Sequence, residues 1–349
     1  MSYTYNSVQP EAVKDSYSET DTCDFVLTFE NKSLVLDTLK VEGFITTTDN
    51  VNSSMDAKAG IHGIIDTISV DTQNRGNIQT LNEYTQYVHM ISGANYARDD
   101  YYNSQFISEL RCDAEVSGAN YLKPSLSGVP PDFSFKPLCA LNQSVGDNKQ
   151  LGFSKSGSIT IRIRLRKNAE FLHGVNLTSG ASYSVSNLKL CYATINGDNK
   201  QPVVMKTYHY LSQNVDTKLA NINTKVPAVC SGVACSFYPI DNLNQPTLNQ
   251  SETVSLPELD EVIFMFNDST SRYITYPIRT LEEVKSHYLE SLSFSSHNSL
   301  TLNSDKNFGI GLDFNQMIDL RNQKFNVQIK SGITSRFKMH MYFLGVIGM

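Results

Sequence analysis

Two short segments come close to motifs that carry chemistry. Gly152-Phe153-Ser154-Lys155-Ser156 approaches the G-x-S-x-G turn of a nucleophilic serine, but a serine stands where the motif needs its last glycine. Phe308-Gly309-Ile310-Gly311 contains the G-x-G of a dinucleotide-binding turn, but it lacks the third glycine and a following helix. Glycines in a strand are more typical of a bend or of closely packed backbones. Neither segment therefore predicts catalysis or cofactor binding.

Histidine and cysteine are common ligands of transition metals, but their spacing here does not predict a metal site. Cys230 and Cys235 could form half of a zinc site, yet no second pair follows at the expected distance. The six cysteines are therefore interpreted mainly as buried free thiols. The seven histidines are dispersed without an i, i+4 pair: His62, His89, His173, His209, His287, His297 and His340. We predict no catalytic, cofactor-binding or metal-ligating residues, no cofactor, and a chain that is not an enzyme.

Three arginines alternate with aliphatic residues along one segment. In residues 159–166 the aliphatic side chains share one face, and Arg162, Arg164 and Arg166 share the other. The favoured interpretation is a solvated or salt-bridged outer face. A contact with an acidic surface of a neighbouring subunit is the second interpretation. A contact with nucleic acid or with lipid headgroups is the third interpretation, because three charges are a small footprint for phosphate binding.

Composition narrows the class of protein before any fold is considered. The chain has 349 residues, a formal net charge of −6, a charged fraction of 18% and a hydrophobic fraction of 40%. These values exclude a disordered chain, and the negative net charge argues against a globally basic protein that binds nucleic acid specifically. No window reaches the roughly 18 apolar residues of a membrane span. The first 24 residues are polar and acidic, so no secretory signal is expected.

The remaining pattern predicts mostly β-structure. Asparagine, serine and threonine are abundant, and 18 Tyr with 17 Phe suit pleated, half-buried surfaces. Residues 1–22 lack periodicity and are expected to form a flexible arm. Two helices are expected, over 77–91 and over 280–292, the second opened by a capping box of Thr280 and Glu283. Strands are expected over 23–29, 33–47, 64–70, 133–138, 159–166, 183–195, 203–211, 262–266, 308–314, 325–329 and 337–343.

These elements recur in the same order twice. In each half, a strand precedes the helix, and a phenylalanine-led strand, an alternating strand and an aromatic strand follow it. The spacing between matching elements shortens along the chain, as expected when the first copy has longer loops. The order predicts an all-β protein of two tandem eight-stranded jelly-roll β-sandwiches, each with a short inserted helix. We place the first jelly roll at residues 23–198 and the second at 199–349.

Several segments, in this order and at this length, resemble the double jelly-roll major capsid proteins of the adenovirus–tectivirus lineage of double-stranded DNA viruses. The segments that carry the resemblance are 131–138, 157–165, 181–192 and 308–314. The resemblance implies a homotrimer with a nearly hexagonal outline that tiles the facets of an icosahedral virion shell. It also implies partners: neighbouring capsomers, vertex (penton) and minor capsid proteins, and an internal membrane in some members.

Other functions of the same architecture stay open at this point. A virion spike or vertex protein, a carbohydrate-binding tandem β-sandwich and a transient assembly scaffold would all fit two jelly rolls. A cupin-like or hydrolytic β-enzyme would need converging histidines and carboxylates, which the spacing does not offer. The capsid interpretation places the protein in the virion shell, made inside the host cell without a signal peptide.

Overall fold

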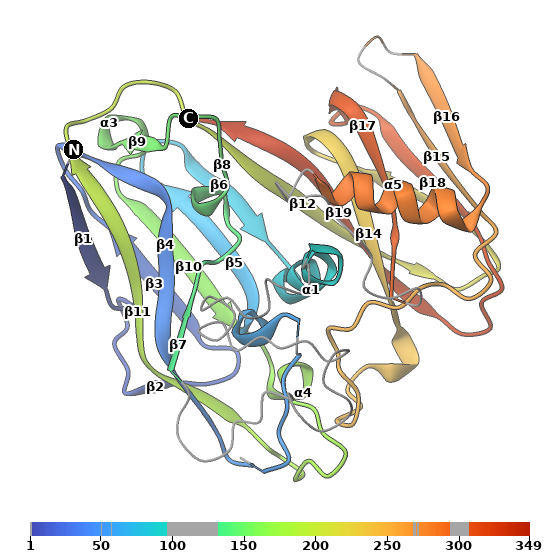
Figure 1. Ribbon diagram of the computed structural model, residues 1–349, viewed down its shortest axis with the longest axis horizontal. Coiled ribbons are helices and arrows are strands. Elements are labelled where there is room, and N and C mark those ends of the chain that lie inside the picture. The colour runs from blue at the N-terminus through green and yellow to red at the C-terminus, as the bar shows by residue number, and fades with distance from the viewer. Residues whose placement is uncertain are drawn as a thin grey trace.

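The chain is built almost entirely from antiparallel β-strands, as predicted (Figure 1). The computed structural model describes residues 2–49, 51–56, 58–95, 132–267, 270, 272–293 and 307–349. The polar, tyrosine-rich sequence of residues 92–131 predicts an extended loop, and most of this segment lies outside the described residues. The strands form two pairs of facing sheets, one pair from each half of the chain.

The first pair of sheets comes from the N-terminal half. One sheet has the order β1-β11-β4-β7, with β2 and β9 as short additions, and the other has the order β3-β10-β5-β6. The bounds are β1 Tyr3–Val8, β2 Ser16–Tyr17, β3 Thr22–Leu27, β4 Lys32–Thr47, β5 Ile65–Thr72, β6 Gly76–Leu81, β7 Asp132–Phe135, β9 Gln150–Gly152, β10 Ile159–Leu165 and β11 Tyr183–Asn196.

The second pair of sheets comes from the C-terminal half of the chain and includes one short strand, β8, from the N-terminal half. One sheet has the order β17-β14-β19-β12-β8, and the other has the order β13-β18-β15-β16. The bounds are β8 Ser144–Val145, β12 Val204–Val215, β13 Leu219–Lys225, β14 Val229–Pro239, β15 Glu261–Asn267, β16 Tyr273–Ile278, β17 Ile310–Asp319, β18 Lys324–Lys330 and β19 Phe337–Gly348.

The two halves share one topology, strand for strand. Leaving out the short strands β2, β8 and β9, each half pairs its first, eighth, third and sixth strands in one sheet. Its second, seventh, fourth and fifth strands form the other sheet, which is the jelly-roll arrangement. A helix joins the fifth and sixth strands in both: α1 (Tyr84–Asn95) and α5 (Leu281–Ser293). The predicted double jelly roll is therefore the observed fold.

Short helices complete the connections between these strands. They are the 3₁₀-helices η1 (Gly60–Ile64), η4 (Ala140–Asn142) and η5 (Ile240–Asn242), and the single-turn helices α3 (Phe153–Ser156) and α4 (Asn168–Phe171). The glycines at 60 and 63 predict a bend within residues 59–63, and η1 lies there.

Strand alternation and local capping form as the sequence predicts. In β10 the aliphatic residues are buried and the arginines exposed, because one face of the strand packs on the core. The apolar residues of 183–195 change parity near Asn187, which predicts a bulge, and there φ is +49° and the pairing of β11 with β4 shifts register. The amide of Glu283 donates to Thr280 Oγ1, and the amide of Thr280 donates to the Glu283 carboxylate, which completes the capping box of α5.

The N-terminal segment differs from the expected flexible arm. Residues 3–8 form β1, which pairs with β11 over six residues and is the first strand of the first roll. The amide of Glu11 then donates to the carbonyl of Asp24, which ties the next segment down. The strand lacks an apolar period because its Tyr3 and Tyr5 side chains point outward, and Val8 alone packs against the core.

The first helix starts later than expected, and several strands were missed. Ile78 and Leu81 are three residues apart, as on a helix, but they belong to the strand β6, where Leu81 pairs with Ile68. Glu83, with φ +50°, turns the chain into α1. Residues 262–266 are apolar at every position, which predicts burial on both faces, but the strand β15 alternates in burial. The strands β13, β14 and β16 were not predicted.

Removing β1 tests whether the first strand belongs to the roll. Deletion of residues 2–8 strips the backbone partners from six residues of β11, so we expect the melting temperature to fall by several degrees. Circular dichroism during heating measures this. The Tyr5→Thr variant keeps the strand and serves as the control with a nearly unchanged melting temperature. An unchanged melting temperature after the deletion would show that the roll does not need β1.

Candidate assembly surfaces

The described residues do not assemble a chemical site from the motifs considered above. No group of three or more His, Cys, Asp or Glu side chains that could hold a metal ion occurs among them. In the same part of the chain, no helix is long and apolar enough to cross a membrane. The described cysteines are free, and burial raises the pKa of Cys23 to about 12 and that of Cys139 to about 11. These thiols are therefore protonated at neutral pH and unreactive.

The glycine-containing segments serve packing. A Cβ at Gly309 would lie 1.7 Å from the carbonyl oxygen of Cys235, and one at Gly311 would lie 2.1 Å from Ser291 Oγ. Glycine is needed here because β17 approaches its neighbours closely. Ser154 lies in α3, where its amide donates to Asp198 Oδ1 at 3.0 Å. Both segments are structural parts of the rolls, and the close packing at Gly309 and Gly311 is the one that the sequence predicted.

The three arginines of β10 and its end divide between two environments. Arg162 Nε lies 2.8 Å from Asp24 Oδ1, and Arg164 Nε lies 3.6 Å from Asp66 Oδ2, both on an exposed face. This is the salt-bridged outer face that the alternation predicted. Arg166 differs because it is buried and donates to Ser251 Oγ, a residue of the second roll, at 2.7 Å. Its role at the junction between the rolls was not predicted.

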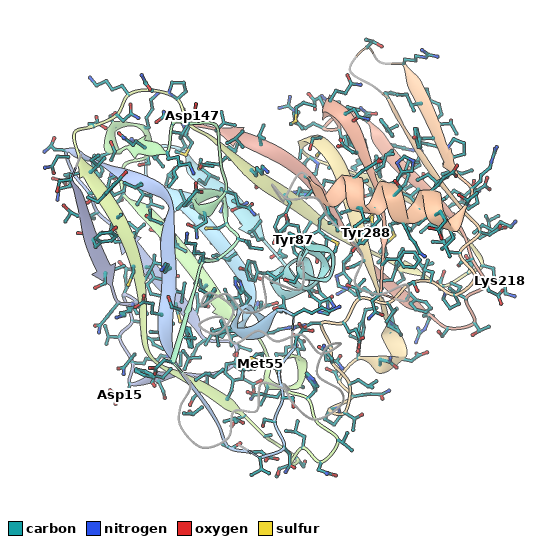
Figure 2. The ribbon with its side chains drawn as sticks, viewed as in Figure 1. Asp15, Met55, Tyr87, Asp147, Lys218 and Tyr288 are labelled. Carbon is teal, nitrogen blue, oxygen red and sulfur yellow. The ribbon has the colours of Figure 1, made fainter. Side chains whose placement is uncertain are left out.

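The junction between the rolls is the most extensive candidate for a functional surface. Through Tyr87, α1 of the first roll contacts the sheet of the second roll that contains β12 and β19 (Figure 1). Tyr87 of α1 contacts Tyr208 with ring centroids 4.0 Å apart, and Tyr342 at 5.2 Å. Figure 2 shows Tyr87 on α1 between the two rolls, and Tyr288 on α5. Aromatic side chains thus fill the space between the two sandwiches.

The second roll offers the outer face of its sheet to α1. On β19, Phe343 points inward and contacts Phe325 of the opposing sheet, with ring centroids 5.1 Å apart. Tyr342, its neighbour, therefore points outward. Tyr342 also pairs with Tyr210 of β12, and the Tyr342 hydroxyl donates to the carbonyl oxygen of Glu83. The first and eighth strands of the second roll therefore carry the contact surface.

Backbone pairing and a side-chain bond join the two rolls further. β8, which belongs to the first half of the chain, pairs with Val204 and Met205 at the start of β12. Gln79 of β6 donates to Thr207 Oγ1 of β12 at 2.7 Å. The same Gln79 side chain accepts from the amide of Ala140. The fifth strand of the first roll is thus held beside the first strand of the second.

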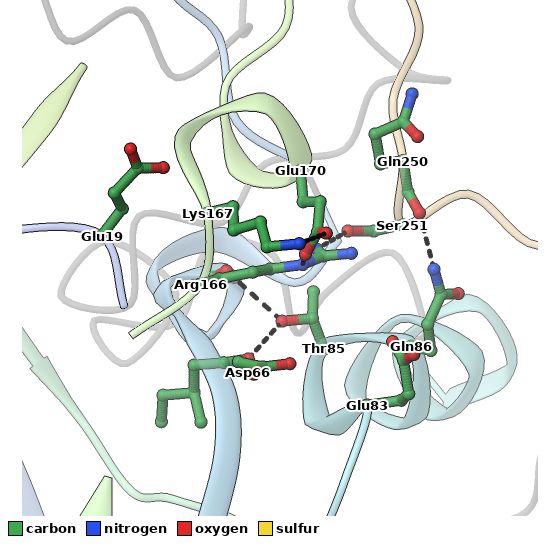
Figure 3. A network of polar contacts seen from close by, with 12 residues as sticks. Glu19, Asp66, Glu83, Thr85, Gln86, Arg166, Lys167, Glu170, Gln250 and Ser251 are labelled. Atoms are coloured by element: carbon green, nitrogen blue, oxygen red, sulfur yellow. Dashed lines mark hydrogen bonds and ion pairs between the residues drawn. The ribbon is translucent and has the colours of Figure 1, made fainter. Parts of the chain in front are cut away.

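The connection between β14 and β15 makes polar contacts with α1 and with Arg166, just after β10 (Figure 3). Arg166 reaches toward Ser251, and Gln86 Nε2 of α1 donates to the carbonyl oxygen of Gln250 at 2.6 Å. Nearby, the buried Asp56 accepts from His89 Nδ1 at 2.7 Å and from the side-chain amide of Asn249. Asn249 belongs to the second half, so one carboxylate joins both rolls.

The buried charges at the junction are stabilised by their partners. Burial alone would raise the pKa of Asp56, but His89, Asn249 and the amide of Ala59 lower it well below its usual range. Burial also opposes the charge of Glu83, but His340 and Lys338 bring its pKa below the ordinary value. Lys338 Nζ lies 3.0 Å from Glu83 Oε1. The contacts of Asp56 help to fix how the rolls meet, since losing a partner would leave a buried charge alone, whereas Glu83 and Lys338 are only partly buried.

A weak sequence signal for this junction did exist. α1 has no charged residue between Tyr84 and Asn95, whereas α5 has Glu282, Glu283, Lys285 and Glu290. A short helix without charges is typical of one that is covered on all sides. The absence of charge does not show which part of the protein covers α1. Contacts between distant residues, such as Arg166 with Ser251, leave no pattern in the local sequence.

Comparison with known proteins supports the fold. No family model matches the chain, and no curated protein matches it in sequence. The crystal structure of the STIV MCP matches with a TM-score of 0.54 and 8% identity, covering 99% of this chain and 96% of that one. The crystal structure of the mavirus major capsid protein matches with a TM-score of 0.51 and 11% identity, covering 99% and 88%.

A further match comes from the atomic structure of Sulfolobus Turreted Icosahedral Virus. Its TM-score is 0.52 at 7% identity, and it covers 98% of this chain and 90% of that one. The whole chain, and not one roll alone, is therefore similar to these structures. The chain has the double jelly-roll fold that major capsid proteins have.

The buried pair of Asp56 and His89 gives a test of the junction. Asp56→Ala removes the carboxylate that holds His89 and Asn249, so we expect the free energy of unfolding to fall by about 3–5 kcal/mol. Denaturant titration measures this. Asp24→Ala breaks the exposed pair with Arg162 and should cost at most about 1 kcal/mol. Equal losses in the two variants would contradict a stabilising role of the buried pair.

His340 predicts how stability depends on pH. Burial lowers the pKa of His340 to about 4 in the folded chain, against about 6.5 when unfolded. Between these values the unfolded chain binds a proton that the folded chain does not, so stability falls as the pH drops from about 6.5 to 4. The expected slope from this residue is at most about 1.4 kcal/mol per pH unit.

The His340→Gln variant is the matched test of that slope. Denaturant titration at several pH values should give a smaller slope in the variant than in the wild type. Burial also lowers the pKa of His209, so some slope remains. The same slope in both proteins would show that His340 titrates normally in the folded chain.

Proposed function

We propose that this chain is a major capsid protein, a structural subunit of an icosahedral virion shell. The observation that carries the proposal is the double jelly-roll fold, shared along nearly the whole chain with the STIV and mavirus proteins. Two rolls of one topology, fixed side by side by a buried helix, give each subunit two similar building blocks. A function that used one roll alone would not need this junction.

The mechanism of such a protein is self-association. Three subunits bring together six rolls, so a closed trimer has a nearly hexagonal outline and can tile a flat facet. Closed symmetry limits the growth of the trimer itself. We propose the two rolls as the assembling domains, with the boundary between β11 and β12 and with β1 included in the first roll. Neighbouring capsomers, vertex proteins and minor capsid proteins are the partners that follow from this role, in the virion shell.

The mass of the purified protein tests the proposal. We expect light scattering to give about three times 39.0 kDa at micromolar concentration, because obligate interfaces bury enough surface to keep the subunits together. A strict monomer at this concentration would contradict the proposal. Binding to a glycan array by such a monomer would favour the carbohydrate-binding alternative.

A further inference from the structure

The sheet β13-β18-β15-β16 has an outer face that is directed away from the first roll. The other sheet of the second roll turns its outer face to α1, and the two sheets meet through contacts such as Phe325 with Phe343. β15, β16 and β18 accordingly lie at the end of the long axis opposite to β1 (Figure 1). We call this outer face the distal face. Its centre consists of two rows of side chains in register: Asn221, Gln328 and Ile263, and Asn223, Asn326 and Met265.

The centre of the distal face is polar but uncharged. Asn221 and Asn223 are exposed on β13, and Gln328 and Asn326 face them on β18. Within the described residues, none of these four amide side chains makes a hydrogen bond, and the Oδ1 atom of Asn326 is buried without a donor. An amide offers both donors and an acceptor. The face therefore presents hydrogen-bonding groups that the chain itself does not use.

The equivalent sheet of the first roll uses its outer face differently. There the seventh strand, β10, carries Arg162, whose Nε lies 2.8 Å from Asp24 Oδ1 on the second strand, β3. In the second roll the same two strands are β18 and β13, and their facing side chains are amides. Because the rolls share one topology, the fold does not require the unpaired amides of the distal face.

Two lysines face each other at one end of the distal face. Lys225 is the last residue of β13, Lys324 is the first of β18, and the two are paired in register and exposed. In the described part of the chain neither lysine has an acidic partner, although the net charge of the protein is −6. Like charges directly opposite each other destabilise a sheet. An anion from outside the chain would relieve this repulsion.

An exposed tyrosine lies at the same end of the sheet. Tyr273 of β16 is 57% exposed and pairs with Asn267 at the end of β15. Gln323, which precedes Lys324, donates from Nε2 to the carbonyl oxygen of Asn267 at 3.0 Å. Tyr273 is therefore two strands from Lys324, which places the two backbones ~10 Å apart. An aromatic ring, a cation pair and unpaired amides thus share one surface.

The charges at the opposite end of the distal face are paired. Lys330 of β18 bonds to Asp260, and Glu261, which faces Lys330 on β15, lies 3.2 Å from Arg279 Nε. Spare positive charge is therefore found at one end only. This distribution fits a ligand with an acid at one end and a neutral, polar body. A nucleic acid, which carries a phosphate at every nucleotide, would need positive charge along the whole face.

We propose that the distal face binds a glycan that ends in an acidic sugar. Lys225 and Lys324 hold the carboxylate, and the ring of Tyr273 packs on the apolar side of a sugar ring. The amides of Asn223 and Gln328 bond to hydroxyl groups of the neutral sugars that follow. This binding activity goes beyond the proposed function and does not depend on it.

Two variants with matched controls test the proposed site in the full chain. Lys324→Gln removes one charge from the distal face, and Lys40→Gln removes the charge of an exposed lysine on β4 of the first roll. Tyr273→Thr removes the exposed ring, and Tyr5→Thr does the same on β1, where the tyrosine is 82% exposed. Threonine suits a strand, so both changes should preserve the fold. Circular dichroism and melting temperature establish that each variant is folded.

Titration with 3′-sialyllactose and with lactose, followed by saturation-transfer NMR, measures the binding. We expect the wild type to bind 3′-sialyllactose at least about tenfold more tightly than lactose, because only the first has a carboxylate. Lys324→Gln should weaken the binding of 3′-sialyllactose about tenfold, and Tyr273→Thr should weaken it about fivefold. Lys40→Gln and Tyr5→Thr should bind as the wild type does.

The other results each overturn the inference or a part of it. A folded wild type that does not bind 3′-sialyllactose would overturn the site, and equal binding of lactose would overturn the role of the lysines. Equal losses in the variants and their controls would place the binding elsewhere. Folded Lys324→Gln and Tyr273→Thr variants that lose the oligomeric mass and keep the glycan affinity would make the distal face a contact between chains.

Light scattering on the same samples separates this inference from the proposed function. A trimer that binds no glycan would overturn the distal site and leave the capsid proposal standing. A monomer that binds 3′-sialyllactose through Lys324 and Tyr273 would support the distal site and contradict the capsid proposal.

Discussion

The packing of α1 between two sandwiches is the interaction on which the rest of the structure depends. A jelly roll closes its own core between two facing sheets and leaves the outer faces of those sheets to solvent. In this chain one outer face is instead covered by a helix from the preceding roll, through Tyr87, Tyr208 and Tyr342. Burying these aromatic surfaces turns two small domains into one body with fixed geometry.

Polar contacts around this apolar centre set the orientation of the rolls. Apolar packing tolerates small rotations, but a hydrogen bond or a buried ion pair does not. The hydrogen bond from Gln79 to Thr207 holds one part of the junction, and the hydrogen bond from Asn249 to Asp56 holds another. A subunit that forms flat arrays needs its two rolls at a constant angle. The polar contacts at the junction would hold that angle, which fits the proposed capsid role.

Much of the fold could be predicted because its signals are local. The alternation of residues 159–165 reflects one buried face, and Thr280 with Glu283 marks a helix start regardless of what surrounds it. The repeated order of elements then gave two jelly rolls. β1 could not be predicted in this way, because its outward tyrosines leave no apolar period. β6 was mistaken for helix because Ile78 and Leu81 have a spacing that both structures allow.

The candidate surfaces were beyond sequence reasoning for a different reason. In the sequence, Arg166 continues the alternation of Arg162 and Arg164 and cannot be told apart from them. Only its hydrogen bond to Ser251, 85 residues away, makes it a residue of the junction. Such pairings depend on the arrangement of whole domains, which no local pattern encodes.

The most direct test of the account is an electron cryo-microscopy map of the purified protein. The proposed function predicts a closed ring of three chains that contains six similar rolls. A map of single separated chains, or of an assembly without three-fold symmetry, would contradict it.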